Sequence, residues 1–266
     1  MTGIWRKLAG LIPGIASAAT IAATPAPPSE AEADQAWQKA YDVREQYYKN
    51  TIGTFPTDIL KLSHMTGVWP GGGLFVLEAN KLGKDMRVYS TFGLSNPDMP
   101  TPVALAESKT EHDAQGRVSN TESRLEKRQP ATAPAGAAGY GYEFIVVARE
   151  KSEWPLWLLQ WACNAEILND VGFLARVDKY KGLTVEKIQV GPDPADIVNI
   201  LIARAQAPLP VGTQLPNGRM DILVATVITE DEMNWSMENG RDTLLGKLQA
   251  AGVGQVSDRK RASVLK

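Results

Sequence analysis

The stretch GYGYEFIVVAREKSEWPLWLLQWACNAEIL, residues Gly139 to Leu168, decides the fold that we expect for this chain. Its first part has the two-residue period of a strand, with aromatic residues alternating with glycines. One face carries Tyr140, Tyr142, Phe144 and Val146, and the other carries Gly139, Gly141, Glu143, Ile145 and Val147. Glycine inside a strand usually marks a bulge or the close approach of another backbone.

The second part is apolar almost all round a helix, which is typical of a buried helix. We expect its main stripe to be Trp154, Trp157, Leu158, Trp161, Ala162, Ala165 and Leu168. The stretch therefore predicts a strand followed by a buried, tryptophan-rich helix.

Patterns on the amino-terminal side of this stretch predict one helix and one hairpin. Ser29 and Glu32 form a capping box, and apolar residues at helical spacing carry the helix to about Asn50. Two strand-like runs, 74–80 and 86–93, are close enough to form an antiparallel hairpin.

Patterns on the carboxyl-terminal side predict three strands, two helices and a final strand. The strands are predicted at 183–190, 197–205 and 220–228. A second capping box at Thr229 opens a helix that runs through Trp235, and another helix spans 242–251. The segment 255–266 is expected to pair as the last strand. Helices and strands are mixed without βαβ alternation, which predicts an α+β fold with a mixed or largely antiparallel sheet and flanking helices.

Composition limits the function classes. The chain has 266 residues, 44% apolar and 22% charged, enough for a sizeable core without staples. A single cysteine excludes an intrachain disulfide framework. The net charge of −2 gives no electrostatic footprint for nucleic acid, so we expect no nucleic-acid partner.

The amino terminus leaves two alternatives. Residues 1–28 carry two basic residues, then an apolar run that Pro13 interrupts, then Ala-rich and Pro-rich sequence. They form either a surface tail on a cytoplasmic protein or a leader for export to the periplasm through residues 1–26, which could also act as a membrane anchor. We expect the folded domain to span 29–266, with 107–139 as a flexible insertion because that segment has little periodicity.

Residues with catalytic chemistry show no motif. His64 and His112 have no partner at motif spacing, and Cys163 lies in the apolar helix, so we expect no catalytic role for them. The glycines 71–73 lack the Lys-Ser/Thr of a phosphate loop and predict a turn. Two histidines and one cysteine cannot build a zinc tetrad, and we expect neither a metal nor a cofactor. The basic run 259–261 is expected to be a solvated edge.

Glu143 stands out because it lies in the middle of an apolar strand. A buried carboxylate is costly unless it is paired, so Glu143 is either in a structural ion pair or at the rim of a groove where it contacts a partner.

Five segments together resemble the suppressor-of-fused family. They are FGLS at 92–95, GYGYEF at 139–144, WPLWLLQWACNAEIL at 154–168, ATVITEDEMNWSMENG at 225–240 and VSDRKRASVL at 256–265. Each is weak alone, but five in the family's order are specific, and the resemblance covers about 29–266. It implies an α+β binding scaffold without a catalytic centre.

The resemblance also implies partners. Animal members of the family grip an extended peptide of a transcription factor by strand addition, and bacterial members look like immunity proteins that neutralise a toxin. This chain has Ala135 where animal members carry an acidic residue of the peptide site, so an animal-type target peptide is not implied.

We therefore predict a bacterial, single-domain, non-enzymatic binder of another protein, with a cognate toxin as its target. Its predicted contact residues are Gly139, Tyr140, Gly141, Tyr142 and Glu143, where the glycines admit a partner backbone and the tyrosines supply rigid contact area. Two alternatives stay open: a hydrolase or transferase that uses Glu143 or Asp221 in a cleft, and an exported envelope binding protein.

Overall fold

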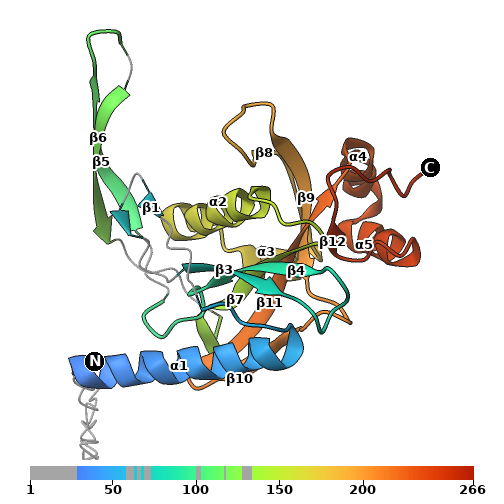
Figure 1. Cartoon of the computed structure of the whole chain (residues 1–266), viewed down its shortest axis with the longest axis horizontal. Coiled ribbons are helices and arrows are strands. Elements are labelled where there is room, and N and C mark those ends of the chain that lie inside the picture. Colours follow the sequence, from blue (N-terminus) through green and yellow to red (C-terminus); the bar gives the residue numbers. More distant parts are fainter. Residues whose placement is uncertain are drawn as a thin grey trace, which may run out of the picture.

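The computed structural model of the chain describes residues 29–57, 63–64, 67–68, 73–99, 103–116, 118–127 and 134–266. Within these residues there are five helices and twelve strands (Figure 1). The helices are α1 (Glu30–Thr51), α2 (Trp154–Asn169), α3 (Phe173–Tyr180), α4 (Glu230–Asn239) and α5 (Arg241–Ala250). The strands are β1 (Ser63–His64), β2 (Gly67–Val68), β3 (Gly73–Glu78), β4 (Arg87–Phe92), β5 (Val103–His112), β6 (Val118–Lys127), β7 (Ala137–Ala148), β8 (Leu183–Gln189), β9 (Ile197–Arg204), β10 (Gly212–Leu215), β11 (Gly218–Ile228) and β12 (Val256–Ser257).

The main sheet has eight strands, and β7 lies at its centre. The order is β3-β4-β7-β11-β9-β8, with β10 on β11 and β12 on β7. β7 is parallel to β11 and β12, and the sheet's other pairings are antiparallel. The sheet is therefore mixed and mostly antiparallel, which confirms the predicted α+β class.

Helices cover both faces of this sheet (Figure 1). On one face, Tyr48 of α1 and Ile52, which follows the helix, pack in a cluster with the Ile145 side of β7. On the other, α2 and α3 pack on the Phe144 side of β7. α4 and α5 form a third cluster with Leu201 of β9 and its neighbours. β7 is thus buried from both sides.

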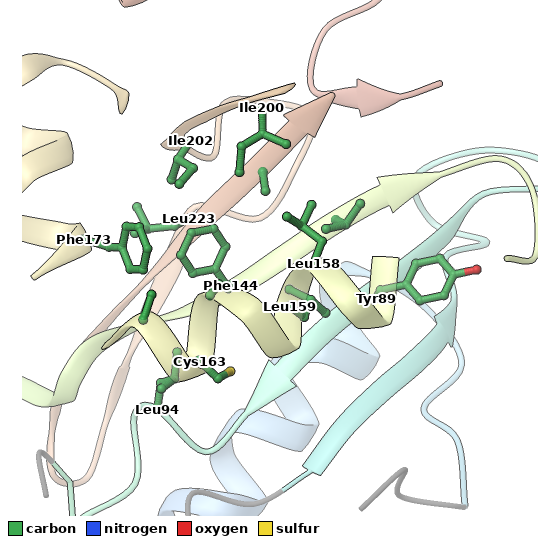
Figure 2. Packing of buried hydrophobic residues seen from close by; sticks show 14 of the residues in the cluster. Tyr89, Leu94, Phe144, Leu158, Leu159, Cys163, Phe173, Ile200, Ile202 and Leu223 are labelled. Carbon is green, nitrogen blue, oxygen red and sulfur yellow. The ribbon is translucent and has the colours of Figure 1, made fainter. Parts of the chain in front are cut away.

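The packing of α2 on the sheet forms the largest cluster (Figure 2). Leu158, Leu159 and Cys163 of α2 are buried in this cluster together with Phe144 of β7. The ring of Phe173 from α3 meets Phe144 edge-on, with 5.3 Å between ring centroids. This contact joins α3 to β7.

One part of the predicted α2 stripe is wrong. Trp154 is 4% exposed, as expected, but Trp157 is 40% exposed. Leu159, Cys163 and Ile167 take the inner positions instead. Because α2 is apolar on nearly every side, its periodicity could not show which side faces the sheet.

Most predicted elements are confirmed. The Ser29 capping box opens α1, which ends one residue past the expected Asn50. The hairpin pairs β3 with β4 antiparallel, and β8, β9 and β11 match the three predicted strands. α4 continues four residues beyond Trp235, to Asn239.

Two segments differ from expectation. Part of the segment 107–139, expected to have little regular structure, belongs to the antiparallel hairpin of β5 and β6 and to the start of β7. In the segment 255–266 only Val256 and Ser257 pair as a strand, because the chain then turns to place Arg261 beside Glu232. The division into a tail, a domain and an insertion stays a prediction.

The expectations for residues 1–28 and for the glycines 71–72 lie outside the described residues. In the part of the chain that the structure does describe, no helix combines the length and the apolar character needed to cross a bilayer.

Candidate functional site

The two glycines of the predicted contact segment 139–143 lie against other parts of the same chain. Gly139 and Gly141 have φ of +58° and +88°, where a side chain is strained. A Cβ on Gly139 would meet the carbonyl oxygens of Leu94 and Asn96, the latter at 2.9 Å. A Cβ on Gly141 would lie 2.8 Å from Cδ2 of Leu174 in α3. The space beside both glycines is thus filled from within the molecule.

Glu143 is paired inside the protein. Its side chain and that of Arg44 from α1 are both fully buried, and Nη1 of Arg44 donates to Oε1 of Glu143 at 3.1 Å. The hydroxyls of Thr91 and Ser95 donate to the same carboxylate at 2.6 Å each. A buried charge thus has both a counter-ion and hydrogen bonds, as a low-dielectric site demands.

Backbone amides complete the acceptor positions of Glu143. The N–H groups of Gly93, Leu94 and Ser95 point at the carboxylate, with N···O distances of 3.2, 3.4 and 3.0 Å. These residues follow β4 directly, so the carboxylate organises the turn that leaves the strand. Charge-assisted bonds of this kind are among the stronger ones in proteins.

The donors on Nη2 of Arg44 are used in the same place. They reach the carbonyl oxygen of Phe92 at 3.3 Å and Oδ1 of Asn96 at 2.7 Å, and the guanidinium carbon lies 4.1 Å from the centre of the Phe92 ring. Burial lowers the pKa of Arg44, and the negative charge of Glu143 opposes that effect. The network therefore ties α1, the end of β4 and β7 together.

The tyrosines of the contact segment also face inward. Tyr140 and Tyr142 are buried in the α2 cluster, and the Tyr142 hydroxyl donates to Glu166 of α2 at 2.6 Å. Glu166 accepts further bonds at 2.9 Å from the amides of Gly172 and Phe173, where α3 begins. Burial, followed by the charge of Glu166, raises the pKa of Tyr142 well above its usual value. This face of β7 therefore sets the junction of α2 and α3.

Asp221, the second carboxylate considered for catalysis, is held by two arginines. Its oxygens lie 2.7 Å from Nη1 of Arg204 and 2.9 Å from Nη2 of Arg219. Arg204 continues to Asp178 of α3 at 2.6 Å. Asp221 thus belongs to a chain of charges of alternating sign, and it has a different set of cations from Glu143.

Of the remaining candidates for chemistry, those whose side chains are described show no activated geometry. His112 is exposed at the end of β5, and the side chain of His64 lies outside the described residues. Cys163 is fully buried, and desolvation raises the pKa of its thiol well above the usual value, followed by smaller effects of Glu143 and Glu166. Among the described residues no group of three or more His, Cys, Asp or Glu side chains could hold a metal.

The basic run at the carboxyl end is solvated only in part, because Arg259 and Lys260 are exposed but Arg261 is not. Arg261 is paired with Glu232 at 2.5 Å, and their side chains are 10% and 0% exposed. Arg259 is paired with Asp196 at 2.9 Å. The run was misjudged because its counter-ions come from distant parts of the sequence.

Arg44 and Glu166 were not among the functional residues predicted from the sequence, although each left a signal there. Arg44 lies between Ala40 and Tyr48 on the buried stripe of α1, at spacings of four residues. Glu166 carries the single charge of α2. A charged residue within an apolar stripe predicts a buried partner elsewhere in the fold.

The free edges of the sheet differ in how they can meet another chain. β8 has a register shift between Val185 and Ile188, with the exposed charges of Glu186 and Lys187 at that point. Bulges and charges of this kind block strand addition. At the opposite edge, β3 is bridged to Thr54 at its last residue.

Concave surface lies at one end of the sheet, where β4 begins and β7 ends. A hollow of about 240 Å³ there is lined by residues that include Leu82, Met86, Arg149, Leu209 and Val256. A second hollow of about 300 Å³ shares Gly83 and Met86 with it. A third of about 290 Å³ shares Arg149 and Val256. We call the three adjoining hollows the end groove.

The fold and the buried network define the class of this protein: an α+β scaffold in which the charges beside the central strand hold the structure together. The model of the suppressor of fused protein (SUFU) family matches residues 72–262, so the chain belongs to this family. The match confirms the resemblance found in the five sequence segments. It begins after Ser29, so the predicted start of the domain stays a prediction.

Solved structures of the same family are similar to this chain at low identity. The chain in the crystal structure of the Sufu–Fu complex is 16% identical, with 86% of this chain and 92% of that chain covered and a TM-score of 0.45. Drosophila Suppressor of Fused is 14% identical, with 86% and 51% covered and a TM-score of 0.48. A SUFU homologue from Neisseria gonorrhoeae is 16% identical, with 87% and 97% covered and a TM-score of 0.45. A search of curated proteins found no match.

Proposed function

We propose that this chain is a non-enzymatic protein-binding domain, and that it acts in a bacterium as an immunity-like inhibitor of a cognate toxin. Its membership of the SUFU family carries the proposal, because that membership implies a domain that recognises another polypeptide. We place the protein in the cytoplasm. The alternative, export through residues 1–26, is decided by the intact mass of the native protein, since export would remove the leader.

The geometry supports binding over turnover. A catalytic carboxylate must be free to exchange a proton with a substrate. Glu143 instead forms an ion pair with a buried arginine and accepts hydrogen bonds from three backbone amides. Asp221 forms ion pairs with two arginines. We propose that Gly139, Tyr140, Gly141, Tyr142 and Glu143 affect partner binding through the surfaces that they position, because all five are buried.

The test begins with the partner. The tagged full chain is used to capture proteins from its own cell extract, and each captured protein is expressed alone and together with the chain. We expect one captured protein to arrest growth when expressed alone, growth to recover when the chain is co-expressed, and the two purified proteins to form a stable complex. An unrelated protein expressed at the same level is the control.

Two results would contradict the proposal. If the captured partner is harmless when expressed alone, or if its toxicity persists while the complex forms, the chain is not an inhibitor of a toxin. If the purified chain turns over a substrate, and Asp221→Asn removes that turnover without changing the unfolding curve, the chain is an enzyme.

A further inference from the structure

The end groove combines an apolar floor with polar rims. In its central hollow, Met86 and Leu209 are buried members of the α1-side cluster, and Leu82 and Val256 pack partly buried against it. The floor is therefore continuous with the packed interior, and it keeps its shape without a ligand.

One wall of the central hollow is fixed by Gln255. Its side-chain oxygen accepts from the amide of Gln206 at 2.8 Å, and its side-chain nitrogen donates to the carbonyl oxygen of Arg204 at 3.0 Å. Both ends of the Gln255 amide are therefore engaged in holding the 205–209 segment against the turn before β12. The hollow has a rigid wall on this side.

Arg149 lies where the central hollow meets the third hollow and lines both. It is exposed, and no described residue forms a hydrogen bond or an ion pair with its guanidinium. Glu150, Asp258 and Lys260 share the third hollow with it, so the local charges balance. Direct contact with Arg149, more than a long-range field, would then select a ligand.

We propose that the end groove binds an extended segment of the protein partner, with a large apolar side chain in the central hollow and a carboxylate two residues away on Arg149. This inference rests on the proposed function and names the surface and the chemistry of its partner. A hollow of about 240 Å³ lies below the usual size of a small-molecule pocket, roughly 300–1,000 Å³, and suits one side chain.

The spacing follows from strand geometry. In an extended chain, residues two apart point the same way and lie about 6.8 Å apart, so neighbouring hollows can take alternate side chains. A guanidinium matches a carboxylate with two parallel hydrogen bonds, which makes an Asp or Glu side chain the best complement to Arg149. The partner segment thus has the pattern apolar–any–acidic, in one direction or the other.

The test uses a display library of random twelve-residue peptides selected against the full chain. We expect enrichment of the apolar–any–acidic pattern. A synthetic peptide from the selection is then labelled, and its affinity is measured by fluorescence anisotropy. Arg149→Gln should weaken binding roughly tenfold or more, and so should replacing the acidic residue of the peptide by its amide. When the amide peptide is tested against Arg149→Gln, its affinity should be little weaker than with either change alone.

Lys151→Gln is the matched control. Lys151 is an exposed cation two residues from Arg149, and it lines none of the three hollows. The Lys151→Gln substitution should leave the affinity for the peptide unchanged. Both substitutions are at exposed positions, and an unchanged urea unfolding curve verifies that each variant is folded.

The outcomes separate this inference from the proposed function. If no peptide is enriched, or if enriched peptides bind Arg149→Gln as tightly as the natural chain, the end groove is not the binding surface, even if toxin neutralisation is observed. If peptides of the expected pattern bind through Arg149 and no captured protein is toxic, the end groove is the binding surface, but the chain is not an inhibitor of a toxin.

Discussion

The buried pair of Arg44 and Glu143 gives the sharpest test of the fold. In Glu143→Ala, the guanidinium of Arg44 keeps its neutral acceptors but loses its counter-ion, and the amides of Gly93, Leu94 and Ser95 lose their acceptor. Removing one member of a buried ion pair costs about 3–5 kcal/mol. For a chain of this size the melting temperature would fall by roughly 6–20 °C.

A double-mutant cycle isolates the pair itself. Arg44→Met alone leaves the Glu143 carboxylate without its cation and is expected to cost a similar amount, about 3–5 kcal/mol. In the double variant no charge is stranded, so its cost should fall below the sum of the single costs by about 1–3 kcal/mol. The matched control is the exposed pair of Glu45 and Lys49 on the same helix, whose removal should cost less than about 1 kcal/mol.

The assay is urea unfolding at neutral pH, followed by far-ultraviolet circular dichroism and by tryptophan fluorescence. Coincident transitions with both probes justify a two-state free energy. The reasoning is refuted if Glu143→Ala lies within about 1 kcal/mol of the natural chain, or if the two single costs add to the double within about 0.5 kcal/mol.

Three further predictions use the same unfolding assay. Gly139→Ala should lower the free energy of unfolding by about 2 kcal/mol more than Gly136→Ala. Both glycines have positive φ, but only at Gly139 would the new Cβ collide with other atoms of the chain. Equal losses would show that the backbone conformation alone sets the effect. Trp154→Ala should lower the free energy of unfolding by about 3–5 kcal/mol, because Trp154 is buried. Trp157→Ala should lower it by about 1 kcal/mol or less, because Trp157 is 40% exposed. The reverse order would mean that α2 is rotated about its axis. Burial acts to raise the pKa of Glu232, but hydrogen bonds from the side chain of Arg261 and from two amides outweigh it and lower the pKa below its ordinary 4.5. Its stabilisation is therefore complete above about pH 4.5 and is lost as the pH falls through the lowered value, so the cost of Glu232→Gln should shrink between pH 7 and pH 3; a constant cost would contradict this.

The sequence predicted the elements whose signal is local. The alternation in β7 and the capping boxes of α1 and α4 depend on residues a few positions apart, and all three were located correctly. The β5–β6 hairpin escaped notice because runs such as VSNTESRLEK lack the apolar alternation of a half-buried strand. Backbone pairing alone defines such strands, and no side-chain pattern reports it.

The candidate site was predicted only in outline. The position of Glu143 in an apolar strand required a counter-ion, but the one it has lies 99 residues away on α1. No local rule connects positions so far apart, because their meeting depends on how α1 crosses the sheet. The same limit explains why the glycines of β7 were expected to admit a partner, when the backbone beside Gly139 is that of Leu94 and Asn96.

The segments by which the family was recognised meet one another inside the protein. Gly93, Leu94 and Ser95 of one segment donate to the carboxylate of Glu143 from another. Gly139 of that second segment lets the turn after Phe92 approach. These residues build the scaffold, and they are too deeply buried for a partner to read them directly. Recognition must then reside in exposed residues, and Arg149, which lies outside the five segments, is such a residue. Changing the exposed residues of the end groove should therefore change the partner that this scaffold accepts while leaving its fold intact, whereas changing the buried residues around Glu143 should damage the fold first.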